Sequence, residues 1–177
     1  MFGKNGWKMT ARAWLSQETA QTNLAVMLAV GVLSLLCFIG VRILCGQPYR
    51  MMLELGIQDL IPPVWLFTLL QAVAYVTAGC AAGFVLGYRP LCFAAEKYKG
   101  GMLFVITLAL ELCWYPLLFT GGMVFAALLQ SLFALALAVL TTICFFHVSR
   151  FAGWIMVFHT VWLAYLLILT FRIFIRN

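Results

Sequence analysis

The chain carries very little charge for its length. Only 9% of its 177 residues are Asp, Glu, Lys or Arg, whereas 66% are apolar. A water-soluble domain has about 25% charged residues and no more than about 50% apolar ones. Because a surface that faces water needs charge, we expect lipid to be the solvent for most of this chain.

Several motifs of soluble chemistry are missing as well. The six cysteines show no CxxC pairing, so neither a zinc site nor a disulfide framework is predicted. The two histidines, His147 and His159, are too far apart for one helical metal site. No phosphate-binding glycine loop is present, and Ser131 and Ser149 have no base nearby in sequence, so hydrolase chemistry has no support. The net charge of +6 comes from scattered residues at helix ends, which indicates anchoring to lipid headgroups and not binding of nucleic acid.

What the chain does have is a series of apolar runs, each near the ~20 residues that cross a bilayer as a helix. We therefore expect an all-α fold, an integral membrane bundle of five transmembrane helices in a single domain of residues 23–177. The predicted spans are 23–44, 64–86, 102–119, 124–146 and 153–175. Thr120-Gly121-Gly122 leaves room only for a tight turn, so the third and fourth spans should be antiparallel neighbours.

The N-terminal segment, residues 1–22, is polar and basic. Trp7, Ala11, Trp14 and Leu15 lie at i, i+4, i+7 and i+8, which favours a short amphipathic helix on the membrane surface. A signal peptide is the competing interpretation. The apolar run that follows is longer than an h-region of ~7–15 residues, and no cleavage site of small residues follows it.

Basic residues are divided unevenly between the two ends of the predicted bundle. Seven lie on the N-terminal side and four on the other, namely Lys4, Lys8, Arg12, Arg89, Lys97, Lys99 and Arg150 against Arg42, Arg50, Arg172 and Arg176. By the positive-inside rule we expect a cytoplasmic N-terminus and a C-terminus outside.

A few polar side chains fall deep inside the predicted spans, where a polar group is costly and marks a site by default. They combine with aromatic residues into stripes at helical spacing: Gln71 and Tyr75; Glu111 and Trp114; His159 and Trp162, extended by Leu166. Such stripes would line a mostly apolar cavity with a few hydrogen-bonding points, as small-molecule sites usually do. Interhelical hydrogen bonding, worth ~0.6–2 kcal/mol per bond, is the alternative, and it stays open for Gln71, Gln130 and His159.

Of these polar side chains, the carboxyl group of Glu111 costs the most free energy to bury in hydrocarbon. Without a cation at comparable depth, it is expected to be protonated at pH 7 and to donate a hydrogen bond into the cavity, to a ligand or to a facing group such as Gln71. The alternative function is a small-solute transporter or substrate-capture subunit in which Glu111 couples a proton.

Small residues form a GxxxGxxxG run in the second span, at Gly79, Gly83 and Gly87. This spacing lets two helix backbones approach closely. Packing within the bundle and a homodimer seam are the two interpretations.

Short motifs follow one another along the chain from Pro62 to about Arg172. They are Pro62-Pro63-Val64-Trp65 with Tyr75 and Gly79; Trp114-Tyr115-Pro116-Leu117-Leu118-Phe119; Thr141-Thr142 with Val148-Ser149 and Ala152; and Trp162-Leu163-Ala164-Tyr165. In this order, and in a five-span chain of this length, they resemble the translocator protein or tryptophan-rich sensory protein family (TspO/MBR).

The resemblance implies a five-helix bundle, often a homodimer, in a bacterial cytoplasmic membrane. It implies a central pocket, closed by the loop between the first two helices, for porphyrins, haem, sterols or synthetic aromatic drugs, with no cofactor required. The ligand-binding residues expected in such a pocket are Trp65, Gln71, Tyr75, Glu111, Trp114, His159, Trp162 and Leu166.

This sequence departs from the family at several of those positions. Gln71 stands where the family has a mid-helix tryptophan, Glu111 where it has asparagine, Gln130 where it has a carboxylate, and Phe158-His159 where it has Pro-Tyr. Light-driven porphyrin breakdown is attributed in the family to paired pocket tryptophans, of which only Trp162 is kept. We therefore expect a membrane receptor for a hydrophobic or tetrapyrrole-like molecule, and not an enzyme.

Overall fold

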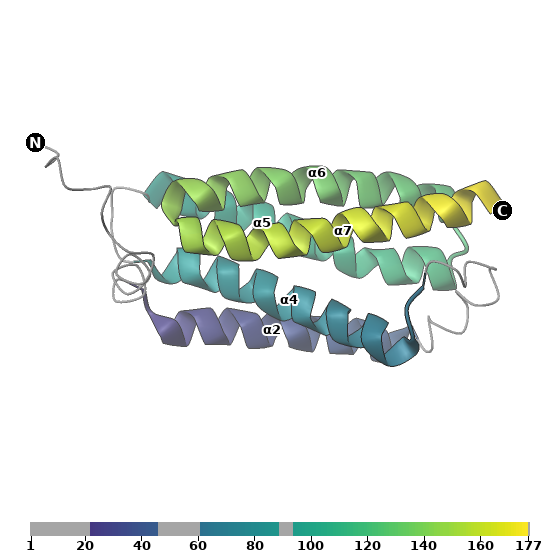
Figure 1. Cartoon of the computed structure of the whole chain (residues 1–177), viewed down its shortest axis with the longest axis horizontal. Coiled ribbons are helices and arrows are strands. Elements are labelled where there is room, and N and C mark those ends of the chain that lie inside the picture. Colours follow the sequence, from purple (N-terminus) through teal and green to yellow (C-terminus); the bar gives the residue numbers. More distant parts are fainter. Residues whose placement is uncertain (1–21, 46–60, 89–93, 177) are drawn as a thin grey trace, which may run out of the picture.

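The computed structural model describes residues 22–45, 61–88 and 94–176. Within these ranges the chain forms five long helices: α2 (Leu24–Leu44), α4 (Val64–Gly87), α5 (Ala94–Tyr115), α6 (Val124–Val148) and α7 (Arg150–Arg176) (Figure 1). A single π-helical turn, η3 (Pro116–Thr120), extends α5. The predicted surface helix in residues 1–22 and the predicted pocket lid lie almost entirely outside the described residues.

The expected all-α bundle of five spans is confirmed. All five helices are long and apolar enough to cross a membrane, and consecutive helices run in opposite directions (Figure 1). The third helix starts at Ala94, before the apolar run that begins near residue 102. This extra stretch carries Glu96, Lys97 and Lys99, and the Lys99 ammonium lies 3.8 Å from the Glu96 carboxylate.

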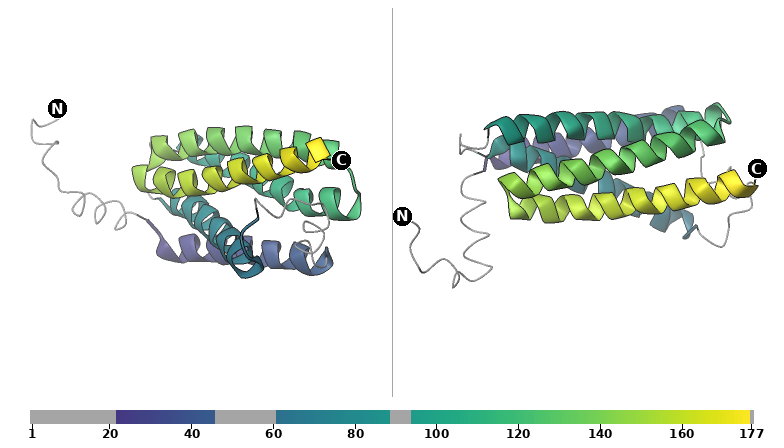
Figure 2. Two further views of the ribbon diagram at one scale, coloured as in Figure 1. Left: turned by 45° about the vertical axis from the view of Figure 1, so that its right-hand side comes forward. Right: turned by 90° about the horizontal axis from the view of Figure 1, so that it is seen from above.

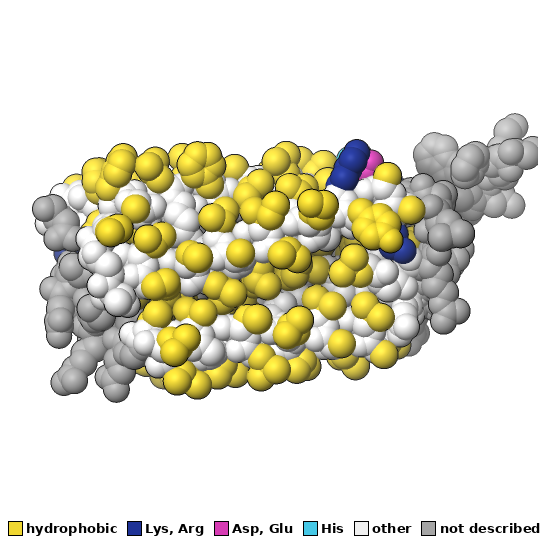
Figure 3. All heavy atoms as spheres, turned by 180° about the vertical axis from the view of Figure 1, so that it is seen from behind, with side chains coloured by type: hydrophobic (Ala, Val, Ile, Leu, Met, Phe, Trp, Pro, Cys, Tyr) yellow, Lys and Arg dark blue, Asp and Glu magenta, His cyan; other side chains and the backbone are white. Residues whose placement is uncertain are grey.

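The outer surface of the bundle is apolar along its length, as Figure 3 shows for one face. Large side chains such as Leu28, Leu33 and Phe133 are more than half exposed on it. Apart from Glu111, the charged residues of the described part lie close to the ends of the helices. A lipid bilayer is therefore the partner of this surface, because exposing so much apolar area to water would be unfavourable.

The helices form a ring in which α4 is the most enclosed member. It packs against α2 on one side and α7 on the other, while α6 lies between α7 and α5 (Figures 1 and 2). Small residues allow this enclosure, since Ala74, Ala78, Ala81 and Ala82 of α4 are all completely buried. Side chains on α4, α5 and α7 consequently meet at the centre.

The glycine run of α4 lies against α2 within the same chain. A Cβ atom added at Gly79 would lie 2.7 Å from the carbonyl oxygen of Val30, and one at Gly83 would lie 2.6 Å from the Cα of Met27. At Gly87 the nearest atom would be the carbonyl oxygen of Asn23, at 3.0 Å. Of the two interpretations of this run, the structure shows packing within the bundle.

The predicted tight turn between the third and fourth spans is confirmed. Pro116 starts the π-helical turn, in which the N–H of Gly121 donates to the Pro116 carbonyl over 2.8 Å. Gly122 follows with a φ of 60°, a left-handed conformation that glycine adopts without strain. The chain can thus reverse direction between α5 and α6 in very few residues.

Candidate functional site

Two ionisable side chains meet at the centre of the bundle. Glu111 lies on α5 and His159 on α7, and the Nε2 atom of His159 is 3.4 Å from an Oε atom of Glu111. Their side chains are only 2% and 1% exposed. The sequence suggests Gln71 as one example of a group that could face Glu111, and in the structure the side chains beside the Glu111 carboxyl are those of His159 and Tyr75.

Gln71 lies on α4, one helical turn from Tyr75, and its hydrogen-bond partner is Tyr115 of α5. The hydroxyl of Tyr115 donates a hydrogen bond to the Oε1 atom of Gln71, joining α5 to α4. Tyr75, one turn further along α4, is fully buried and its ring stacks on Phe38 with centroids 4.9 Å apart. Its hydroxyl lies beside the Glu111 carboxyl. The three predicted polar stripes therefore do converge.

Several polar atoms in this cluster are not paired in good hydrogen-bond geometry, although the Tyr75 hydroxyl and His159 both lie beside the Glu111 carboxyl. The atoms concerned are Nε2 of Gln71, the hydroxyl of Tyr75, both carboxyl oxygens of Glu111, Oε1 of Gln130, Nδ1 of His159 and Nε1 of Trp162. A buried polar group without a partner costs about 1–3 kcal/mol. Native interiors normally satisfy such groups, so this concentration of polar atoms makes the centre of the bundle a candidate site.

The centre itself offers almost no free volume. A cavity of about 10 Å³ lies beside Glu111, Trp114 and Gln130, which is close to the lower limit for one water molecule. The Gln130 amide group also donates to the carbonyl oxygen of Leu110. The aromatic and polar stripes thus fill the middle of the bundle with their own side chains.

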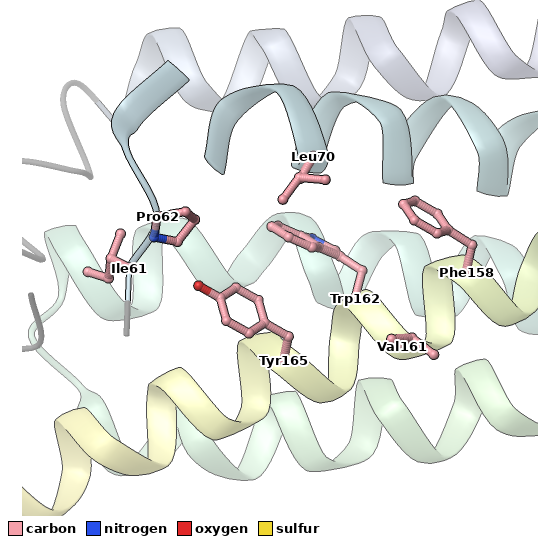
Figure 4. A pocket seen from close by; sticks show the side chains of 7 residues that line it. All are labelled: Ile61, Pro62, Leu70, Phe158, Val161, Trp162 and Tyr165. Atoms are coloured by element: carbon pink, nitrogen blue, oxygen red, sulfur yellow. The ribbon is translucent and has the colours of Figure 1, made fainter. Parts of the chain in front are cut away.

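A larger space lies between α4 and α7. This groove, called the α4/α7 groove below, has a volume of about 500 Å³ and is lined by Ile61, Pro62, Leu70, Phe158, Val161, Trp162 and Tyr165 (Figure 4). Trp162 links it to the centre, because its ring lines the groove and also packs against Phe67, with centroids 5.5 Å apart. The next aromatic ring along α7, Tyr165, lies 5.3 Å from Trp162 between centroids.

The remaining predicted site residues are distributed between the centre and the outside. Trp114 is buried, and its Nε1 atom donates to Thr170 of α7 over 2.9 Å, so the indole already has a partner in the bundle. Leu166 is buried next to the small central cavity. Trp65 is 67% exposed and lies away from the cluster, on the outer surface of α4.

Sequence reasoning missed Tyr115 and Phe67 as members of this centre. Tyr115 follows Trp114 directly, but its pairing with Gln71 depends on how α5 sits against α4. In the described part of the chain, no group of three or more His, Cys, Asp or Glu side chains could hold a metal ion.

Comparison with known protein families gives one result that covers nearly the whole chain. The model of the TspO/MBR family matches residues 25–176. Searches of curated proteins and of solved structures returned no match.

Proposed function

The chain belongs to the TspO/MBR family, and from this premise we propose that it is a membrane receptor for a hydrophobic or tetrapyrrole-like small molecule held at the α4/α7 groove. Family membership supports a membrane binding or receptor protein in general. The ligand class and its position rest on the geometry of the groove and the cluster behind it.

The observation that carries the proposal is the groove with Trp162 at its inner wall. Its volume of about 500 Å³ falls within the ~300–1,000 Å³ of typical small-molecule sites. Trp162 and Phe158 offer aromatic surface on which a planar ligand could stack. The central cavity of about 10 Å³ is far too small for a macrocycle, so of these two spaces the groove is the one large enough for a porphyrin or haem.

We propose binding without rapid chemical conversion of the ligand. The position at which the family has a second pocket tryptophan is Gln71, and its side chain is committed to Tyr115. A paired-indole photochemistry therefore has no second indole at this position. Under illumination, bound protoporphyrin IX should persist with this protein much as it does with a Trp162→Phe variant.

The position of the ligand can be tested directly by placing a bulky side chain at the outer edge of the α4/α7 groove. Val161 lines the groove and is 63% exposed, so Val161→Trp should block the groove without disturbing the core. Binding of protoporphyrin IX to protein in nanodiscs, followed through porphyrin fluorescence, should weaken by the ~1–3 kcal/mol that aromatic stacking supplies, roughly 5- to 150-fold in Kd.

Ile168→Trp is the matched control. Ile168 lies on the same helix, is 55% exposed and lines a different apolar depression between α6 and α7. Its substitution should leave porphyrin affinity unchanged. Equal affinity of the Val161→Trp variant and the unmodified protein would place the ligand elsewhere and end this proposal.

A proton-coupled transporter is the second candidate, and the contact between Glu111 and His159 is what favours it. Uptake of a porphyrin into proteoliposomes that depends on an imposed pH gradient, and is lost in Glu111→Gln, would favour transport over simple binding.

A further inference from the structure

Glu111 and His159 form an isolated ionisable pair inside the membrane. The basic residues nearest in the described part are Arg42, Arg172 and others close to the helix ends, so none lies at the depth of Glu111. The groups that face the pair from the surrounding helices are Tyr75 of α4, Gln130 and Ser131 of α6, and, near Tyr75, Cys37 of α2. Amides and alcohols carry no charge, and phenols and thiols are uncharged at neutral pH.

A single proton makes such a pair electrically neutral. It can reside on the carboxyl oxygen, as COOH facing a neutral ring nitrogen, or on the nitrogen, as an imidazolium facing a carboxylate. With no proton the pair is negative, and with two it is positive. Either net charge is costly in a medium of low dielectric constant, whereas the one-proton state avoids that cost.

We propose that Glu111 and His159 together are a binding site for one exchangeable proton at mid-membrane, and that this proton reaches water only at the end of the bundle where α2 terminates. The proton moves between Oε of Glu111 and Nε2 of His159, and it is exchanged with bulk water. Neither a ligand nor a second copy of the chain is required.

The direction of access follows from a series of polar side chains at successive helical turns. One helical turn, about 5.4 Å, separates Glu111 from Tyr115 on α5, and the same spacing separates Tyr75 from Gln71 on α4. Because the two helices are antiparallel, both steps lead to the same end of the bundle, and there Tyr115 donates to Gln71.

The last polar contact in this direction, between Arg42 and Thr68, lies about one helical turn beyond Gln71. The guanidinium of Arg42, in the final turn of α2, donates to the Thr68 hydroxyl over 2.9 Å. Arg42 is also close enough to interact electrostatically with Tyr115. Polar side chains therefore continue from the pair to the end of α2.

The opposite direction is closed by apolar packing. Ala78, Phe84, Phe104, Phe145 and Met156 belong to one buried cluster between the pair and the other end of the bundle. On that side, Thr107 donates to the Leu103 carbonyl of its own helix, and the hydroxyls of Thr142 and Thr160 lie 2.9 Å apart between α6 and α7. Beyond this pair of hydroxyls, the buried apolar cluster fills the interior of that half among the described residues.

The shared proton can be tested by nitrogen NMR, because the chain has only two histidines. In protein labelled with ¹⁵N-histidine, Glu111→Gln should shift the ring resonances of His159 and leave those of His147 in place. His147 is exposed on α6 and serves as the internal reference. The control variant Glu96→Gln changes a partly exposed carboxylate outside the centre and should leave the His159 ring resonances in place. Identical His159 resonances in the unmodified protein and Glu111→Gln would refute the shared proton.

The access side is tested by the rate at which the shared proton exchanges with water. Tyr115→Phe removes one hydroxyl of this series of polar side chains while keeping the ring, and it should slow exchange several-fold. Thr107→Val is the matched control, since Thr107 lies on the same helix, is fully buried and faces the apolar half. Slowing by Thr107→Val but not by Tyr115→Phe would show access from the wrong end. Both measurements use protein without ligand, so their outcome is independent of the porphyrin titration.

Discussion

Replacing Gly83 with alanine should force α2 away from α4. The added Cβ would lie 2.6 Å from the Cα of Met27 and 2.8 Å from the carbonyl oxygen of Val26. Non-bonded carbon atoms prefer about 3.5–4.0 Å, so the two helices must separate by roughly 1 Å at this point. Both contacted atoms belong to backbone, which cannot move aside as a flexible side chain can.

The size of the effect follows from overpacking. Adding a methyl group to a well-packed interior typically costs about 1–3 kcal/mol, and a gap of ~0.5–1 Å forfeits a quarter to a half of each dispersion contact it opens. We expect the upper part of this range for Gly83→Ala. Alanine also gains up to ~1 kcal/mol over glycine in helix propensity, which offsets part of the loss.

Gly40→Ala separates these two contributions. Gly40 lies in α2, and an added Cβ there would meet no atom within 4 Å. It therefore reports the gain in helix propensity alone. The difference in free energy of unfolding between the two variants, measured by titration from dodecyl maltoside into SDS micelles, should be about 2–3 kcal/mol. Equal stability of the two variants would show that α2 does not pack on this glycine run, and the arrangement of α2 against α4 would be wrong.

Two further predictions concern contacts between α5 and α7 and the topology. Trp114→Phe and Thr170→Val each remove one side of the hydrogen bond between these helices. A double-mutant cycle on the free energy of unfolding should give a coupling of about 0.6 kcal/mol, with ~1.7 kcal/mol as an upper value. Additive effects of the two substitutions would mean that the bond contributes nothing. In a background without native cysteines, Lys97→Cys and Arg172→Cys should react with a membrane-impermeant maleimide from opposite sides of the membrane, and labelling of both from one side would contradict five alternating spans.

Much of the fold could be predicted because lipid imposes a simple rule on sequence. A span must satisfy its backbone hydrogen bonds internally and present apolar side chains, so each helix is visible as an apolar run. Where polar residues continue a helix into the headgroup region, as at Glu96 and Lys97, composition no longer marks the boundary. The start of α5 at Ala94 was therefore not predicted.

The candidate site could be predicted only in part. Helical spacing correctly grouped Gln71 with Tyr75 and His159 with Trp162, because residues three or four apart share a face of a helix. It could not indicate which faces meet. Tyr115, not Glu111, bonds Gln71, and that choice depends on the vertical offset between α4 and α5. Trp65 fits its motif, yet its side chain points away from the cluster, since the direction in which the first turn of α4 faces depends on the packing of the whole helix.

By itself, then, the sequence determined the solvent, the number of spans, the family and the presence of costly polar groups at mid-membrane. These properties depend on composition and local spacing, which each segment carries independently of the others. Only the tertiary structure decided that Glu111 meets His159, that the glycine run packs against α2, and that the space between α4 and α7 is larger than the cavity at the centre. Each of these depends on the rotation and axial offset of one helix against another, and those are set by the packing of all five helices together.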